Sequence, residues 1–242
     1  MPQPDEMVSA VQAALERVPQ VNRHASRIAL EVQDGILLMS GEVQDIIAKR
    51  LAHRAAIETL SVDRVLDLLQ VTPAERRSDV QIAGFLERLL MQESVFRDYR
   101  VEVVAGVPPA PAEIRASPRE HSVTALVSEG VVTLAGTAES LTHRRLADVL
   151  AWWTPGTCGV RNLVHVVPDE QDSDGEMSDA LRIVLDKDPW LDAAAIVINV
   201  KQRTVTLEGV VSSQEQRRMA EQDAWYILGV HGVVNRLRVQ TS

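Results

Sequence analysis

The sequence is poor in the features that mark disulfide-bonded, secreted and membrane-spanning proteins. Cys158 is the single cysteine, so no disulfide can form within the chain, and we expect the protein in a reducing cytoplasm. No apolar run approaches the roughly 20 residues that a helix needs to cross a bilayer. The first residues, MPQPDEMVSA, lack a basic segment followed by an apolar run, so we expect no secretory signal. A periplasmic location would follow only if a signal peptide had been removed before them.

Signatures of catalysis and of metal binding are also missing from the sequence. No serine lies in a G-x-S-x-G turn, and no glycine-rich loop is suited to cradle phosphate. Cys158 has no evident base, and the 6 histidines have no zinc-ligand spacing. The acidic stretch 172–175 lacks the third carboxylate and the distal glutamate of a calcium loop. We therefore predict a protein that is not an enzyme and that has no cofactor, no metal and no small-molecule substrate.

Acidic residues outnumber basic ones, and the formal net charge is -9. Such a charge argues against a protein that coats nucleic acid or anionic lipid indiscriminately. Any anionic partner would have to be met by a local basic patch, and we expect no nucleic-acid partner.

What the sequence does contain is a repeat, because three segments align without gaps around one glycine each. The segments read DGILLMSGEVQDIIAKRLAHRAA, EGVVTLAGTAESLTHRRLADVLA and QRTVTLEGVVSSQEQRRMAEQDA. The aligned glycines are Gly41, Gly136 and Gly209. Four places later each copy has a helix-capping residue, so a helix is predicted to begin at the same place three times. The capping residues are Asp45, Ser140 and Ser213.

Each copy predicts the same order of elements. Ahead of the glycine, two short segments alternate apolar and polar residues, which indicates a hairpin. An amphipathic stretch precedes each hairpin, and a short apolar run after the second helix predicts a last strand. The predicted fold class is therefore α+β, with three tandem αββαβ modules. Each module is expected to be a three-stranded mixed sheet covered on one face by two helices.

The predicted units cover residues 1–72, 77–168 and 176–242. The middle unit carries a proline-rich insertion over 104–120, which favours an extended loop. Residues 100–105, RVEVVA, are suited to form an extra edge strand. Units of about 65 residues can only just support a core alone, so we expect neighbouring units to make contact.

The element order and two short motifs resemble the BON domain, a module of bacterial envelope and stress proteins. The motifs are GVVTLAG at 130–136 and GVVNRL at 232–237. The first unit differs, because Asp67 replaces the asparagine found as Asn162 and Asn235, and Arg64 replaces a glycine. The resemblance implies a non-enzymatic module that contacts phospholipid or a partner protein and, in some members, binds a cation such as potassium. A potassium site made of backbone carbonyls would leave no side-chain spacing in the sequence.

The second helix of each unit predicts a recurrent outward-facing pair. Positions seven, eleven, fifteen and eighteen after the glycine share one face of largely small or apolar residues, which we expect to cover the sheet. Positions nine and sixteen fall on the opposite face. The pairs there are Arg50 with Ile57, Arg145 with Trp152, and Arg218 with Trp225. The neighbouring charges and rings are Lys49, Arg144, Arg217, Trp153 and Tyr226.

Three uses of this outward face stay open: packing between units or subunits, contact with lipid or a partner protein, and a frayed helix end. We predict that Trp152 and Trp225 anchor whatever contact the protein makes outside its own cores. Trp190, which follows Pro189 at the end of another helix, is expected to plug the core of the third unit.

The predicted function is a tandem-BON binding or adaptor protein that contacts a phospholipid surface or a partner protein in envelope or osmotic stress. One alternative is a structural homo-oligomer that uses the Arg and Trp faces for self-association. Another is a potassium-binding module. An enzyme with a site between units would need converging polar groups that the sequence does not show.

Overall fold

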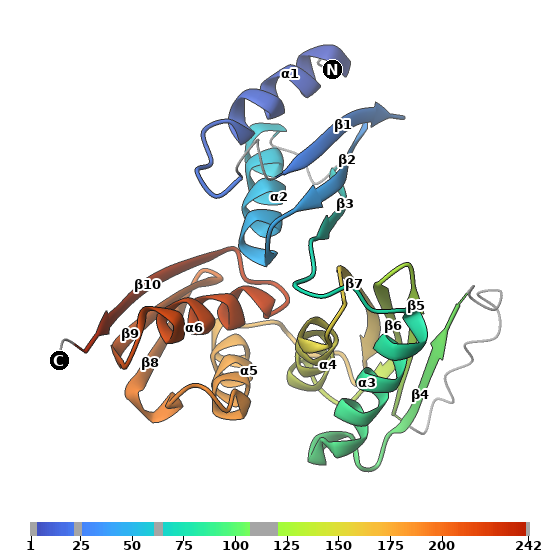
Figure 1. The fold of residues 1–242 in the computed structure, drawn as a ribbon, viewed down its shortest axis with the longest axis vertical. Helices are drawn as coiled ribbons and strands as arrows, with labels where there is room; N and C mark the ends of the chain where they lie inside the picture. The colour runs from blue at the N-terminus through green and yellow to red at the C-terminus, as the bar shows by residue number, and fades with distance from the viewer. Residues whose placement is uncertain (1–3, 22–25, 61–64, 107–120, 241–242) are drawn as a thin grey trace. The chain divides into compact units, whose positions relative to one another are not determined.

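The computed structural model describes residues 4–21, 26–60, 65–106 and 121–240. The chain divides into two compact units, Met1–Pro73 and Ala74–Ser242. The first unit holds one module and the second holds two (Figure 1). Arg64 and most of the predicted insertion over 104–120 lie outside the described residues.

Module 1 is the αββαβ arrangement of the first unit. Its elements are α1 (Pro4–Leu15), β1 (Arg27–Gln33), β2 (Ile36–Val43), α2 (Ile46–Leu60) and β3 (Val65–Val71). The central strand β2 is antiparallel to β1 and parallel to β3. Leu37 and Met39 of β2 share one buried core with Val11 of α1 and Ala52 of α2. Both helices therefore cover the same face of the sheet.

Modules 2 and 3 repeat this order within the second unit. Module 2 contains α3 (Asp79–Gln92), β4 (Arg100–Ala105), β5 (Ser122–Ser128), β6 (Val131–Ala138), α4 (Leu141–Trp153) and β7 (Gly159–Val166). Module 3 contains α5 (Asp174–Lys187), β8 (Ile196–Lys201), β9 (Thr204–Val211), α6 (Gln214–Tyr226) and β10 (Gly232–Val239). The central strands β6 and β9 each have one antiparallel and one parallel neighbour. These mixed sheets confirm the predicted fold class. The sheet of module 2 has a fourth strand, because β4 pairs with β5 in parallel, as RVEVVA indicates.

The repeat glycines occupy the same place in the three central strands. They are Gly41, Gly136 and Gly209, and their antiparallel partners are Ile28, Val123 and Ile196. A Cβ atom on Gly136 would lie 2.1 Å from the carbonyl oxygen of Ser122, and one on Gly209 would lie 2.0 Å from that of Ala195. Only glycine allows this close approach of two backbones, which the positive φ at these positions reinforces. The predicted equivalence of the three glycines is confirmed.

The second helices begin and pack as the sequence predicts. In each copy the capping side chain accepts a hydrogen bond from the backbone N–H three residues later. The alanine eleven places after the glycine is fully buried in every copy. These alanines are Ala52, Ala147 and Ala220. The small-residue face therefore lies against the sheet, where it lets the helix approach closely.

Modules 2 and 3 hold their hairpin turns with a carboxylate from the preceding helix. Asp79 at the start of α3 and Asp174 at the start of α5 each accept two backbone N–H groups of a turn. The turn residues, all with positive φ, are Glu129 with Gly130 and Gln202 with Arg203. The amides of Arg203 and Gln202 hold the pKa of Asp174 below its ordinary value, because they stabilise the charged form.

Candidate functional site

The basic residue eight places after each repeat glycine does not belong to an outward face. Lys49 donates from Nζ to the carbonyl oxygen of Leu69 at 2.7 Å and to Asp67 at 2.8 Å. Arg217 donates to two carbonyl oxygens of β10 at 3.0 and 3.1 Å, and Arg144 is half-buried at the equivalent place. The prediction that these charges lie beside the outward pair is wrong for Lys49 and Arg217. One residue turns the helix by 100°, which is enough to bring position eight against the last strand.

The aspartate that distinguishes module 1 has a partner of its own. In modules 2 and 3, Asn162 and Asn235 donate from Nδ2 to the carbonyl oxygens of Arg144 at 2.9 Å and Arg217 at 2.8 Å. A carboxylate cannot donate, so Asp67 pairs instead with the lysine ammonium described above. All three side chains also accept the backbone N–H two residues later. The substitution therefore changes the link between helix and last strand without removing it.

Arg145 of α4 links module 2 to module 3. Its side chain is buried, with 2% exposure. Nε donates to the carbonyl oxygen of Leu228 at 3.1 Å, and Nη2 contacts Oδ1 of Asp172 at 2.5 Å. Asp172 also pairs with Arg203 of module 3 at 3.0 Å. Position nine of the repeat thus contacts the neighbouring module in this copy.

The end of α4 also packs against α6. The ring of Trp152 stacks on that of Tyr226, with centroids 5.9 Å apart. Nε1 of Trp153 donates to Oδ1 of Asp223 at 3.1 Å. Trp152 is 7% exposed, so its ring is covered within the protein. These contacts bring together four residues from two modules, and three of them are predicted site residues.

The remaining predicted residues take no part in these contacts. Arg50 and Ile57 are half-buried in module 1, and Arg218 is exposed on α6. Trp225 is buried, with 3% exposure, and does not line the groove described next. Whether Trp152 and Trp225 anchor an external contact stays a prediction.

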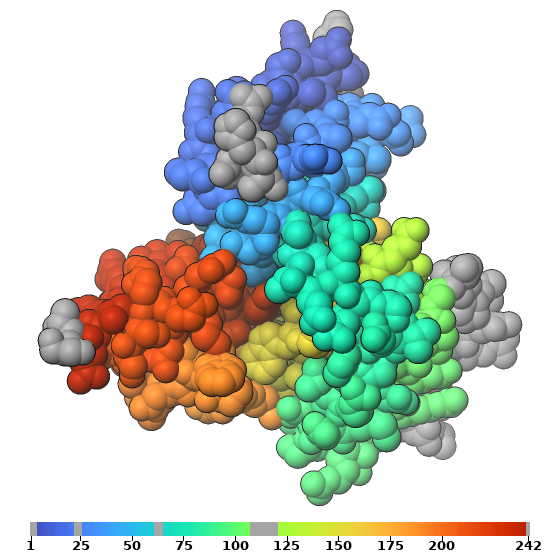
Figure 2. Space-filling model, viewed as in Figure 1, coloured from blue at the N-terminus to red at the C-terminus, as the bar shows by residue number. Residues whose placement is uncertain are grey.

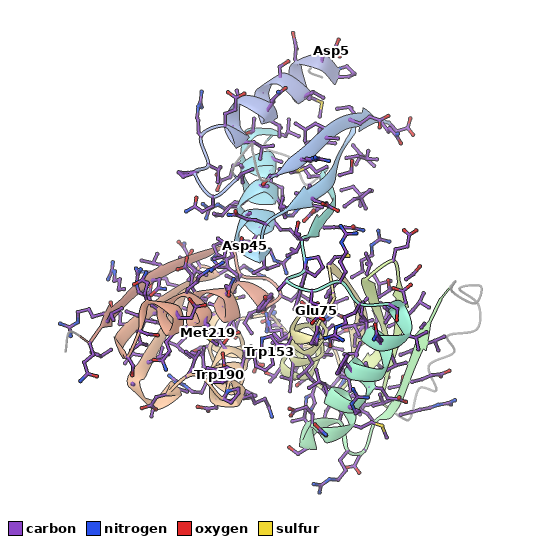
Figure 3. The ribbon with its side chains drawn as sticks, viewed as in Figure 1. Asp5, Asp45, Glu75, Trp153, Trp190 and Met219 are labelled. Carbon is purple, nitrogen blue, oxygen red and sulfur yellow. The ribbon has the colours of Figure 1, made fainter. Side chains whose placement is uncertain are left out.

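A groove of about 490 Å³ lies between modules 2 and 3. Side chains from α3, α4, α6 and the end of α5 line it. The lining residues are Leu89, Trp152, Trp153, Asp188, Pro189, Trp190, Met219, Gln222, Asp223 and Tyr226. Figure 3 labels Trp153, Trp190 and Met219, which come from the two facing modules. In Figure 2 the yellow surface of α4 lies between the green of α3 and the orange of module 3. The groove therefore combines four aromatic side chains with two carboxylates.

Trp190 lies at the rim of this groove, and the prediction that it plugs a core is wrong. It is 70% exposed, the largest exposure of any tryptophan described. Met177, Leu181 and Leu185 of α5 already fill the core of module 3. The chain leaves α5 at Asp188, whose Oδ1 accepts the backbone N–H of Trp190 at 2.8 Å. This turn fixes the backbone at residue 190 while leaving the indole ring in solvent.

Asp223 is a buried carboxyl group with a strongly raised pKa. It is 3% exposed, and burial raises its pKa to about 8. The negative charge of Asp188 raises the pKa further, while the hydrogen bond from Trp153 opposes the rise. Asp188 is itself buried, with 8% exposure. None of the described residues that line the groove is basic.

Neither Asp188 nor Asp223 was predicted from the sequence. Asp223 stands fourteen places after Gly209, where the other two copies have Ala55 and Leu150. An acid at an apolar position of a repeat is the signal that could have identified it. Asp188 follows the first helix of its module, where the three copies do not align closely, and the sequence holds no comparable signal for it.

Two further findings bear on function. Across the described ranges, no three His, Cys, Asp or Glu side chains come together as a metal site. No helix within those same ranges is long and apolar enough to cross a membrane.

Comparison with known families decides the identity of the repeat. The BON domain model matches residues 5–73, 112–168 and 173–241, which are most of the chain. The chain belongs to the BON domain family. The three BON matches fall on the three modules of the structure, and members of this family are generally not enzymes.

Comparison with solved structures gives weaker likenesses. One similar structure is the C-terminal domain of CdsD, a structural protein of the type III secretion system of Chlamydia trachomatis. It is 16% identical, with a TM-score of 0.26 and 100% of both chains covered. A second CdsD structure is 16% identical, with a TM-score of 0.25, and covers 97% of this chain and 92% of its own. Scores this low do not define a common arrangement of whole chains. No curated protein matches this chain.

Proposed function

We propose that this BON-domain chain is a non-catalytic binding or adaptor protein that contacts a protein partner through the groove between modules 2 and 3. The observation that carries the proposal is Trp190, which is 70% exposed at the rim of a groove of about 490 Å³. A tryptophan ring in water leaves a large apolar surface, and tryptophan is enriched among residues that dominate protein interfaces. Binding of a partner would remove this surface from water.

The charge of the groove favours a protein over an anionic membrane. BON domains in general bind phospholipids or partners. Here the groove is lined by the acid Asp188 and by no basic residue among those described, and the whole chain carries a net charge of -9. Both would oppose approach to an anionic lipid surface. The link to envelope or osmotic stress remains an expectation from the family.

Trp190→Ala tests the proposal, with Leu163→Ala as the matched control. Leu163 is also a large exposed apolar residue, at 59%, but it lies on β7 and does not line the groove. A photo-crosslinking residue at 190 should capture a partner in the native cell, and the same residue at 163 should not. Purified partner should then bind the Leu163→Ala variant normally and the Trp190→Ala variant at least about tenfold more weakly.

Two other outcomes would overturn the proposed partner. Co-sedimentation with phosphatidylglycerol vesicles that is lost only in Trp190→Ala would assign the groove to lipid. A mass in solution that doubles with concentration, and stays monomeric in Trp190→Ala, would assign it to self-association.

A further inference from the structure

Among the residues that the structure describes, no cationic side chain pairs with Asp188 or Asp223 of the groove. Lys187, next to Asp188 in sequence, is paired with Glu93, which directly follows α3. Arg145 is committed to Asp172 and the backbone of module 3. Among the described residues no hydrogen-bond donor reaches Oδ2 of Asp223. A buried carboxylate oxygen without a donor is unfavourable unless a proton or a cation joins it.

The surroundings of this oxygen suit an organic cation. Trp152, Trp153, Trp190 and Tyr226 line the same groove, and the faces of aromatic rings attract cations. A hard metal ion such as Ca²⁺ takes about six to eight oxygen ligands, and the groove supplies two carboxylates and one amide. When Asp223 is ionised, this oxygen requires an N–H donor, which ammonium and guanidinium groups carry and a quaternary amine does not.

We propose that Asp188 and Asp223 bind the ammonium or guanidinium group of a basic side chain from the protein partner, with the aromatic rings around it. The inference rests on the proposed binding role and adds the chemistry of its ligand. Leu89 and Met219 line the groove as well and would contact the methylene stem of a lysine or arginine. A negatively charged chain favours a basic partner for the same electrostatic reason.

The proposal has a proton-linked signature. Asp188 and Asp223 are the titratable acids of the lining, and Tyr226 is its third titratable group. Glu93, which follows α3, is paired with Lys187 of α5, and α4 contributes Trp152 and Trp153 to the lining. Because the pKa of Asp223 is about 8, its carboxyl group holds a proton at neutral pH, and an incoming cation would displace that proton. Binding should therefore release about one proton near pH 7 and none near pH 10.

The test uses the full chain and defined probes in titration calorimetry. The first probe is a short peptide with one central arginine, compared with its citrulline counterpart, which has the same shape without the charge. Butylguanidinium and tetramethylammonium are the second pair. The arginine peptide and butylguanidinium should bind at least about tenfold more tightly than citrulline peptide and tetramethylammonium. Proton release is measured by repeating the titration near pH 7 in buffers of different ionisation enthalpy.

Asp223→Asn and Asp188→Asn should each weaken binding of the arginine peptide at least about tenfold. Asp186 lies on α5, is exposed and does not line the groove, so Asp186→Asn should bind the arginine peptide as the wild type does. Equal binding by Asp223→Asn and wild type would overturn the inference. Vesicles of phosphatidylethanolamine that compete with the peptide more strongly than free butylammonium would overturn the protein source in favour of a lipid headgroup.

The two proposals fail in different ways. Loss of partner binding in Trp190→Ala but not in the aspartate variants would contradict the inferred basic ligand. The proposed binding role would be unaffected. Partner binding that survives both Trp190→Ala and Asp223→Asn would sink the proposed function itself.

Discussion

Module 1 and the pair formed by modules 2 and 3 share one internal architecture. They differ at positions that this architecture does not constrain. Each has the repeat glycine opposite the first hairpin strand and a buried alanine eleven places later. At position fourteen, module 1 has Ala55 where module 3 has Asp223, and at position sixteen it has Ile57 where the others have tryptophan. The shared residues hold the sheet and helices together. Two of the differing ones, Trp152 and Asp223, line the groove, so the proposed binding role rests on departures from the repeat.

The largest effect is expected at the shared glycines. Gly136→Ala should cost about 4 kcal/mol or more, or unfold module 2, because the new Cβ would meet a backbone oxygen at 2.1 Å. Gly41→Ala should do the same in module 1, where the distance is 1.7 Å. Urea unfolding followed by circular dichroism measures both. Gly84→Ala is the control, since its Cβ would meet no atom nearer than 3.8 Å and alanine favours a helix. A stable Gly136→Ala protein would contradict the shared architecture.

The next effect is a dependence of stability on pH that module 3 should show and module 1 should not. The pKa of Asp223 is raised from 3.8 to about 8, so the folded state binds its proton more tightly than the unfolded state does. The stabilisation from this proton is complete below about pH 4 and is lost as pH rises through about 8. Asp223→Asn should therefore gain stability relative to wild type across this window, at no more than about 1.4 kcal/mol per pH unit.

Urea midpoints near pH 5, 7 and 9 measure this difference. The advantage of Asp223→Asn over wild type should grow steadily across the series, whereas Asp186→Asn should keep a constant offset. A constant offset for Asp223→Asn as well would show that the buried carboxyl group titrates normally.

A smaller effect compares the same repeat position in modules 2 and 3. Arg145→Ala should destabilise the protein by about 2 to 4 kcal/mol, because it removes a buried guanidinium that bonds Asp172 and Leu228. Arg218→Ala, at an exposed position, should cost less than about 1 kcal/mol. Thermal unfolding of the two variants gives the comparison directly. Equal losses would mean that the contact between modules 2 and 3 contributes nothing beyond surface charge.

The smallest effect concerns an internal link that differs between modules. Lys49 and Asp67 form a nearly buried ion pair in module 1, with side chains 8% and 13% exposed. A double-mutant cycle with Lys49→Met and Asp67→Asn should give a coupling free energy of about 1 to 2 kcal/mol. Hydrogen exchange of β2 and β3 reports on this module by itself. A coupling near zero would show that the pair does not join α2 to β3.

The fold was predictable because its determinants are local and repeated. A glycine, a capping residue and an alanine face recur at fixed spacing, and each acts through its own backbone or its own helix. The hairpins follow from period-two alternation. The prediction for Trp190 was wrong, since the sequence pattern could not show that Met177, Leu181 and Leu185 already fill the core. Asp223 was not predicted, because its significance lies in a deviation from the other copies.

The sequence by itself determined the three αββαβ modules, their glycine-centred registers and the faces of their second helices, because these depend on hydrogen bonds and packing within about 70 residues of chain. Only the tertiary structure decided which residues the ends of those helices contact. Trp153 donates to Asp223, seventy residues away in sequence, and Arg145 donates to the carbonyl oxygen of Leu228, at a separation of 83 residues. Such contacts depend on how two modules dock, and docking is set by the combined shape and charge of surfaces that no single repeat contains. The same docking brings Trp153 of module 2 onto Asp223 of module 3, whose carboxyl group lies buried beside Asp188.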